Sequence, residues 1–364
     1  MGAPNITIAF YEQATASIQR GDKGILAMIL VESSVKELTV TTILDSTDIP
    51  EGYSTDNVKA IKNALIGYQN APKKIIAVAI ATADDYDAAL AELNNYDWDY
   101  VVAPSCETDS KAADIATWIK SQRTNNHKIY KAVLPNQAAD CEGVVNVTGG
   151  YTDADGTELT AEQACARIAG IICGTPMVMS CTYAPITEAL GCPAKDQDAI
   201  DTAVDNGELV LMWDGEKVKI VRGVNSFTTT TEDKGDSFKK IKLVETMDLI
   251  QHDIRKTAED SYIGKYANSY DNKCLLTTAI NGYFDTLIND GILASASCDI
   301  DTDAQRAYLK SKGGKFVVDG ETISVEDATE LQIRQANTGS QVFLKCTISM
   351  LDALEDITID IYIG

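Results

Sequence analysis

The chain has 364 residues, of which 45% are hydrophobic and 23% are charged, which is enough apolar sequence for a globular core of two or more domains. Its formal net charge of −23 argues against nucleic acid and anionic membrane surfaces as partners, since both are bound by clustered Lys and Arg. The longest apolar stretch, residues 169–179, is too short to span a bilayer and contains Gly174 and Pro176.

The first predicted element is a strand at residues 6–11, in which Ile6, Ile8 and Phe10 share one face. The N-terminal sequence has neither a basic region nor an apolar leader. We therefore expect the protein to be made and folded in the cytoplasm.

The next part of the chain alternates between apolar runs and amphipathic segments. Strands are expected at residues 25–31, 38–44, 74–81, 99–104, 127–134 and 144–147. Helices are expected at residues 56–67, 84–93, 110–124 and 161–172, with Asp56, Asp84 and Thr160 as caps. This order predicts parallel β-α-β units and hence a doubly wound α/β domain.

A β-hairpin is predicted around Asp214 and Gly215, and a polar linker follows at residues 228–236. A long helix then begins at Phe238, with its lysines outside the apolar face. A second helix at residues 272–289 and strands at 315–318 and 341–349 complete a smaller α+β domain. The expected divisions are an N-terminal arm, an α/β domain, an α+β domain and a C-terminal arm, at residues 1–22, 23–233, 234–354 and 355–364.

The last eight residues again alternate, with Ile357, Ile359, Ile361 and Ile363 on one face. Ordering each residue costs roughly 1–2 kcal/mol, and burying each Ile returns about 1.5–3 kcal/mol. This near balance predicts that the segment is ordered only where it joins a sheet. The sheet could belong to the same chain, through pairing of the two ends, or to another chain.

The chain offers no recognisable catalytic, cofactor-binding or metal-binding set. His127 and His252 lie near no second metal ligand, and no glycine-rich phosphate loop is present. Asp299, Asp301 and Asp303 match the start of an EF-hand loop, but the required Gly and Glu are absent, so a helix-capping turn is favoured. The nine cysteines include no Cys-x-x-Cys pair and are interpreted as buried free thiols.

Residues 222–229, Arg-Gly-Val-Asn-Ser-Phe-Thr-Thr, resemble contractile phage tail sheath proteins, as do residues 239–245, 248–250, 254–257 and 262–268. The two alternating ends are similar to the arms of that family, so the resemblance covers the whole chain. The short length resembles the compact sheaths of Gram-positive phages and phage-tail-like bacteriocins. The family's large domain has a subtilisin-like layer topology, but this chain has no Asp, His and Ser in that protease's order.

The resemblance implies a structural protein rather than an enzyme. Sheath subunits polymerise helically around an inner tube and contract to drive it through a bacterial envelope. Each subunit's arms add strands to sheets of its neighbours, which would make the arm residues inter-subunit strands. The implied partners are other sheath subunits, the tube protein, the baseplate and the tail terminator, in a particle released by lysis. Lys239, Lys240 and Lys242 are hypothesised to face the tube.

A different class remains open, a doubly wound enzyme or ligand-binding protein with its site at the carboxyl ends of strands such as 99–104. Saturable hydrolase or nucleotide-binding activity that is lost on changing His127 or Asp109 would favour it. No cofactor is expected under the sheath hypothesis. Hollow striated tubes in negative-stain images would favour the sheath.

Overall fold

The computed structural model describes residue 18 and residues 23–318 and 320–363. Two compact units are present. The α/β unit comprises residues 23–251 and 352–363, and the C-terminal unit comprises residues 252–351 together with residue 18. The division falls within the helix α6 (Ile241–Thr257), whereas the sequence suggests a boundary in the linker before this helix.

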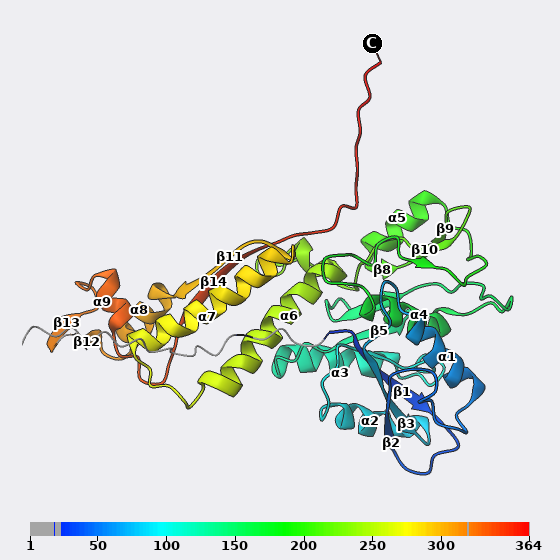
Figure 1. Ribbon diagram of the computed structural model, residues 1–364, viewed down its shortest axis with the longest axis horizontal. Helices are drawn as coiled ribbons and strands as arrows, with labels where there is room; N and C mark the ends of the chain where they lie inside the picture. The colour runs from blue at the N-terminus through cyan, green and yellow to red at the C-terminus, as the bar shows by residue number, and fades with distance from the viewer. Residues whose placement is uncertain (1–17, 19–22, 319, 364) are drawn as a thin grey trace, which may run out of the picture. The chain divides into compact units, whose positions relative to one another are not determined.

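A seven-stranded sheet with the order β2-β3-β1-β4-β5-β6-β8 forms the centre of the α/β unit (Figure 1). Its strands are β1 (Ile25–Val31), β2 (Thr39–Ile43), β3 (Lys74–Ile80), β4 (Tyr100–Val102), β5 (Lys131–Pro135), β6 (Val144–Val147) and β8 (Glu208–Leu209). All neighbouring strands are parallel except β2, which runs antiparallel to β3 at the edge. The predicted parallel β-α-β arrangement is therefore confirmed, with one antiparallel edge strand that the pattern did not predict.

Helices cover both faces of this sheet. Alternate residues of β1 enter two cores: Leu26, Met28 and Leu30 belong to one, and their neighbours belong to the other. The first core contains α1 (Thr55–Ile66) and α4 (Ala161–Cys173). The second contains α2 (Tyr86–Leu93) and α3 (Ala112–Asn125). Because β1 is buried on both faces, it is a continuous apolar run in the sequence.

The helix α4 is almost entirely buried, and its small residues allow close packing. Thr160 caps its first turn and Gln163 completes a capping box, as expected for this pair. A Cβ atom on Gly170 would lie 2.1 Å from the carbonyl oxygen of Ala64 in α1. The absence of a side chain at Gly170 therefore sets how closely α1 and α4 approach.

We predict that Gly170→Ala lowers the free energy of unfolding of the α/β unit by about 2–3 kcal/mol, because both helix backbones must move to admit the methyl group. Urea denaturation followed by far-UV circular dichroism measures the change. Gly282→Ala in α7 is the control, since a Cβ added there would meet no neighbouring segment within 4 Å, and it should be neutral or stabilising by up to about 1 kcal/mol. Equal stability of Gly170→Ala and wild type would contradict this packing account.

A smaller, three-stranded sheet also belongs to the α/β unit. It pairs β7 (Pro185–Ile186) with β10 (Val218–Ile220), and β10 with β9 (Leu211–Trp213). The β9–β10 pair is the predicted hairpin, and Gly215 has the positive φ of 99° that its turn requires. The helix α5 (Gln197–Asp205) was not predicted, although Asp196 caps it.

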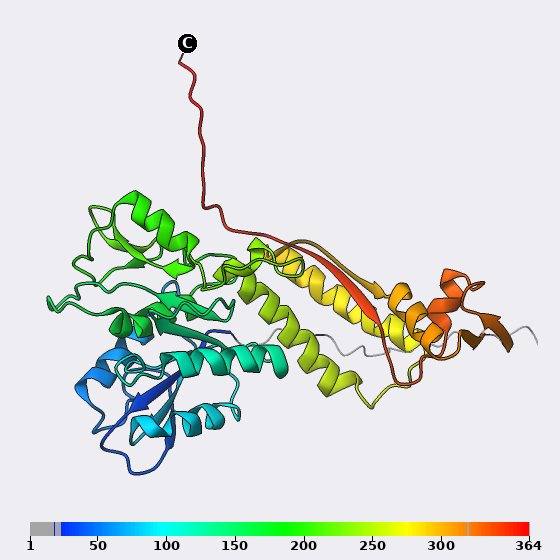
Figure 2. The ribbon, with the colours of Figure 1, turned by 180° about the vertical axis from the view of Figure 1, so that it is seen from behind.

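The described part of the C-terminal unit contains three α-helices, a π-helical turn (Ala258–Tyr262) and two small sheets besides the end of α6 (Figure 2). A two-stranded antiparallel sheet joins β11 (Leu293–Ile300) to β14 (Leu344–Met350), and α7 (Tyr270–Asn289) packs against β11. The remaining elements are α8 (Thr302–Ser311), β12 (Lys315–Val318), β13 (Glu321–Ser324) and α9 (Glu330–Gln335). Five consecutive residues of β14 are exposed, on both faces of the strand.

Several predicted boundaries are wrong for local reasons. Ser54, not Asp56, caps α1, since its side chain accepts the Asn57 amide. The strand β5 begins at Lys131 rather than at His127, whose φ of 51° is left-handed. The helix α6 begins at Ile241, because residues 236–239 form a separate 3₁₀ turn.

Two further observations concern the C-terminal end and the membrane. Residues 357–363 are drawn in red in Figure 1 and contain no helix or strand within the chain, so they pair with no described sheet of their own subunit.

Among the described residues, no helix is both long enough and apolar enough to cross a bilayer.

Candidate interaction site at the base of the C-terminal arm

The segment 222–227 lies shortly before α6, and its central residues are buried. Asn225 is 1% exposed and Ser226 is 2% exposed. The Asn225 side chain donates to the carbonyl of Phe238 at 2.8 Å, and its backbone amide donates to the carbonyl of Lys239 at 3.0 Å. Ser226 donates its hydroxyl to the carbonyl of Cys141 at 3.0 Å, next to β6. These two residues therefore connect the central sheet to the turn before α6, which accounts for their place in the motif.

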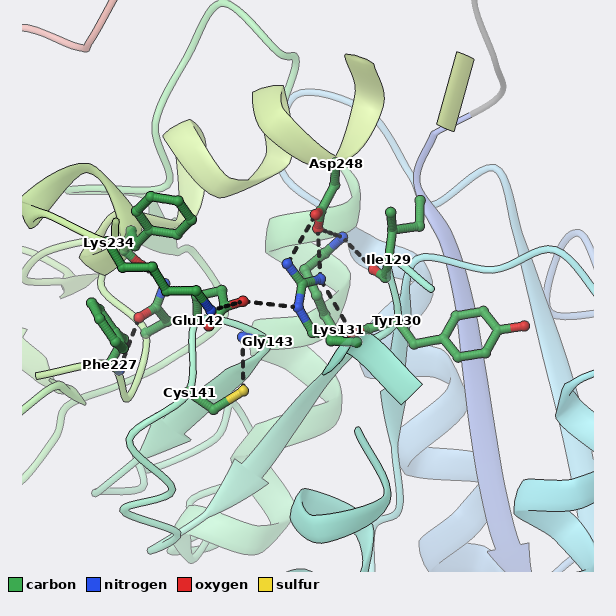
Figure 3. Close-up of polar contacts among 12 residues, drawn as sticks. Ile129, Tyr130, Lys131, Cys141, Glu142, Gly143, Phe227, Lys234 and Asp248 are labelled. Carbon is green, nitrogen blue, oxygen red and sulfur yellow. Dashed lines mark hydrogen bonds and ion pairs between the residues drawn. The ribbon is translucent and has the colours of Figure 1, made fainter. Parts of the chain in front are cut away.

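A buried ionic cluster fixes the first turns of α6 to the sheet (Figure 3). Asp248 accepts two hydrogen bonds from the Arg123 guanidinium, both at 3.0 Å, and one from Lys131 at 2.9 Å. The side chains of Asp248 and Lys131 are 2% and 1% exposed. Burial alone would raise the pKa of Asp248, but the two cations hold it at about 2. The carboxylate therefore stays charged at neutral pH.

Glu142 extends this cluster toward the linker. Its carboxylate lies 3.4 Å from the Arg123 Nε atom and 2.9 Å from the Lys234 Nζ atom (Figure 3). Burial opposes ionisation, yet Arg123 and the hydrogen bond from Lys234 lower the pKa of Glu142. The polar linker predicted at residues 228–236 is thus tied to the α/β unit by at least one ion pair.

The base of the C-terminal arm is bound by the same unit. The Glu355 side chain is only 5% exposed, although it belongs to a terminal segment. Thr182 donates its hydroxyl to Glu355 at 2.5 Å, and the Ser180 hydroxyl lies 3.3 Å from the same oxygen. The second oxygen of Glu355 accepts from Lys240 at 3.1 Å. Each carboxylate oxygen therefore has a partner.

Two cations complete this arm-base site, which we define as Ser180, Thr182, Arg222 and Lys240 with the acidic residues they bind, Asp352, Glu355 and Asp356. Lys240 also pairs with Asp352, and Arg222 donates to Asp356 at 2.5 Å. Burial would lower the pKa of Lys240, but its hydrogen bonds to Asp352 and Glu355 raise it. The hydrogen bond to Asp356 raises the pKa of Arg222. Both side chains remain charged throughout the physiological range.

The predicted arm residues beyond this site are exposed. Ile357 and Ile359 are 74% and 73% exposed, and Ile361 and Ile363 are 81% and 95% exposed. Four large apolar side chains are thus in water immediately after an anchored base. Ile6, Ile8 and Phe10 lie outside the described residues.

The three lysines that were hypothesised to face the tube, Lys239, Lys240 and Lys242, differ in their surroundings. The sequence places all three outside the apolar face of the helix, which is wrong for Lys242, because it is 6% exposed and burial lowers its pKa. Lys240 is bound to the arm base. Lys239 pairs with Asp236 on the surface at 2.9 Å, and its side chain is 36% exposed.

Asp109, named in the enzyme hypothesis, and the aspartates of the EF-hand-like stretch have structural partners. Asp109 accepts hydrogen bonds from Tyr86 at 3.1 Å and from Ser105 at 2.8 Å. In the EF-hand-like stretch, Asp299 pairs with Arg334, and Asp301 caps α8 through the Ala304 amide at 2.9 Å. No group of three or more potential metal ligands occurs within residues 23–318 and 320–363. The helix-capping interpretation of this stretch is confirmed.

Comparison with known families gives two matches that together span most of the chain. The family described as phage tail sheath protein central domain matches residues 79–226, and the phage tail sheath C-terminal domain matches residues 233–364. The chain belongs to the phage tail sheath family. The motif 222–229, whose central residues tie the sheet to the turn before α6, lies at the junction between the two matches.

Similar sheath proteins match this chain over nearly its whole length. The tail sheath protein of Clostridium phage phiCD119 is 37% identical over 98% of both chains. The sheath tail protein of Desulfitobacterium hafniense has a TM-score of 0.70 at 19% identity, covering 95% of this chain and all of that one. The helical sheath of the anti-feeding prophage in its contracted state has a TM-score of 0.70 at 15% identity, covering 100% of this chain and 99% of that one.

The sequence did not identify Ser180, Thr182 and Glu355 as site residues. One signal was available, namely the three acidic residues at positions 352, 355 and 356 between two apolar alternating segments. Their basic partners were present in the recognised motif, but nothing local to either segment indicates that they meet.

Proposed function

We propose that this chain is the structural subunit of a contractile tail sheath, which polymerises helically around an inner tube and contracts to drive the tube through a bacterial envelope. The observation that carries the proposal is the match along the whole chain to a phage tail sheath protein. A chain of similar fold forms the contracted helical sheath of the anti-feeding prophage, and this supports the mechanical role. The role needs no catalytic residue.

Inter-subunit strand addition by the arms is the second part of the proposal. Among the described strands, β14 pairs with β11 only, so its other edge has no described partner. An isolated two-stranded sheet is marginally stable, and the exposure of β14 on both faces suits a strand that receives another. The exposed Ile357, Ile359, Ile361 and Ile363 supply a strand with one apolar face. We assign the same role to Ile6, Ile8 and Phe10.

The arm-base site gives this exchange a fixed starting point. Glu355 and Asp356 are held by Thr182, Lys240 and Arg222, whereas the residues after them are in water. A neighbour that binds the apolar part of the arm is thus linked mechanically to the α/β unit of the donor. Such a connection transmits force while subunits rotate.

For the remaining partners we propose the tube protein, the baseplate and a tail terminator, in a phage tail or tail-like particle released by lysis. Of the three lysines, Lys239 is the one whose exposure suits contact with a tube. We further propose that the seven-stranded sheet with helices on both faces has the subtilisin-like layer topology of the family, without the proteolytic activity of subtilisin.

Negative-stain electron microscopy of the purified full-length protein tests the proposed function. We expect hollow, transversely striated tubes that lengthen with protein concentration. A monodisperse monomer at all concentrations, with or without purified tube protein, would contradict it.

We predict that Glu355→Gln accelerates thermolysin cleavage at Leu354 in the isolated subunit. Hydrogen bonds to a charged group contribute about 1.5–3 kcal/mol, so losing the charge should raise the cleavage rate about tenfold through easier opening of the segment. Leu354 is already 94% exposed, so local opening rather than burial limits cleavage.

Asp356→Asn is the matched control for this variant, because the Asp356 side chain is 79% exposed and its pairing with Arg222 is screened by solvent. Its cleavage rate should stay within about twofold of wild type. Equal rates for Glu355→Gln and wild type would show that the arm base is not anchored by this carboxylate.

A further inference from the structure

Two cysteines face each other across the sheet of the C-terminal unit. In the register of β11 and β14, Cys298 lies directly opposite Cys346. Both are free thiols. Cys298 is 5% exposed, whereas Cys346 is exposed to solvent. The prediction that all nine cysteines are buried is therefore wrong for Cys346, and Cys173, Cys192 and Cys274 are only partly buried.

The side chain of Asn281 in α7 reveals the type of this cross-strand pair. Its amide nitrogen donates to the carbonyl of Cys298 at 2.9 Å, and the Cys298 amide donates to the Asn281 side-chain oxygen at 2.7 Å. Both backbone polar groups of Cys298 therefore point toward α7 and away from β14. Cys298 and Cys346 form a non-hydrogen-bonded pair, in which Cα atoms are about 4.5 Å apart and side chains approach most closely.

This spacing permits a disulfide. Cα separations in disulfides span roughly 4.4–6.8 Å, so the strands need not separate or shift register to form the bond. The two thiols already interact, because Cys298 hydrogen-bonds to Cys346. That hydrogen bond lowers the pKa of Cys346 and, together with burial, raises the pKa of Cys298. The exposed thiol is thus the one that ionises first and meets a reagent in solution.

We propose that Cys298 and Cys346 form a reversible redox site, a dithiol that closes to a cross-strand disulfide when it meets a low-molecular-weight disulfide such as oxidised glutathione. The Cys346 thiolate attacks one sulfur of the reagent, whose S–S bond breaks and releases one thiolate. Cys298 then loses its proton to solvent and attacks the Cys346 sulfur, and the second reagent thiolate leaves. The two cysteines are oxidised by two electrons, and the reagent is reduced to two thiols.

The bond would join β14 to β11 and close a long loop that contains α8, β12, β13 and α9. Closing such a loop removes conformational freedom from the unfolded chain. Because Cys346 is exposed, a thiol in solution can attack its sulfur and reduce the bond again. The site is therefore suited to reversible stabilisation of the sheet rather than to a permanent cross-link.

The experiment uses the full-length protein, reduced and then incubated with oxidised glutathione in native buffer. Alkylation of the remaining thiols, digestion and mass spectrometry should show the Cys298 peptide joined to the Cys346 peptide, with two alkylated thiols fewer than in the reduced protein. The melting temperature of the C-terminal unit should rise by about 5 °C or more and return on reduction.

Three variants separate the steps. Cys346→Ser should slow the reaction with oxidised glutathione about tenfold or more, because the accessible thiolate is lost. Cys298→Ser should leave one glutathione attached to Cys346, since no second thiol displaces it. Cys274→Ser, at a half-exposed thiol of the same unit, should form the cross-link as wild type does.

Two results would overturn the proposal. One is a wild-type protein that keeps glutathione on Cys346 without forming the cross-link. The other is a wild-type protein that loses no thiols while its far-UV circular dichroism spectrum is native. If Cys298→Ser does not fold, the wild-type cross-link is the deciding measurement.

Discussion

Removal of residues 357–364 is expected to leave a folded subunit that does not form long sheaths. Ile357, Ile359 and Ile361 are each more than 70% exposed in the subunit, so their loss removes almost no buried surface from its own fold. In an assembly, burial of each Ile against a neighbour's sheet returns about 1.5–3 kcal/mol. Loss of this contribution at every subunit contact should shorten tubes to discs or short stacks, measured as the length distribution in negative-stain images.

Point variants within the arm give a matched comparison. The double variant Ile359→Asp with Ile361→Asp places charges on the apolar face and should abolish long tubes, as the truncation does. The control is Thr358→Ser with Asp360→Asn, which changes the opposite face of the same strand and should keep tube length near that of wild type. Tubes of normal length from the truncated protein would show that the arm is not required for assembly.

Asp248→Ala is expected to destabilise the α/β unit by about 3–5 kcal/mol, because it leaves the buried cations Arg123 and Lys131 without their shared carboxylate. The three tryptophans, Trp98, Trp118 and Trp213, all belong to the α/β unit. Urea denaturation followed by tryptophan fluorescence therefore reports on this unit alone.

Asp236→Asn is the control for this variant, because Asp236 is an exposed carboxylate before the same helix and pairs with Lys239 at the surface. Its effect should stay within about 0.5 kcal/mol of wild type. A loss of under about 1 kcal/mol in Asp248→Ala would mean that water or a moved side chain compensates the two cations.

The lowered pKa of Asp248 predicts that the stability of the α/β unit depends on pH. Its folded-state pKa is lowered to about 2, below the value of about 3.9 for an unfolded Asp. A group with a depressed pKa contributes stability that is complete above the unfolded value and is lost as the pH falls through the folded value. Wild type should therefore lose stability between about pH 4 and pH 2 more steeply than Asp248→Ala, measured by urea denaturation across this range.

Local signals in the sequence account for most of the α/β unit. The buried strand at residues 25–31 and the capped helix after Thr160 are both found where the pattern predicts them. Both depend on neighbours within a few positions, namely a continuous apolar run and a capping box. The antiparallel β2 and the short helix α5 were missed or misassigned because strand direction and short helices depend on packing that the pattern does not contain.

The candidate sites were much less accessible to sequence reasoning. The arm was recognised from its alternating Ile residues, but its anchoring through Thr182 and Glu355 joins residues 173 positions apart. Lys242 has the sequence position of a surface lysine, yet tertiary packing buries it. The Cys298–Cys346 pair depends on strand register, and a shift of one residue would move the two side chains to opposite faces.

By itself, the sequence determined the alternation of strands and helices, the family motif at residues 222–229 and the unusual apolar arm, because periodicity, caps and alternating Ile residues are local properties. Only the tertiary structure decided which charges meet, which lysine is buried and which edge of a sheet lacks a described partner. These depend on distances between segments that are remote in the chain. The sequence alone therefore predicts a strand in the arm, whereas its anchored base is visible only once the chain has folded.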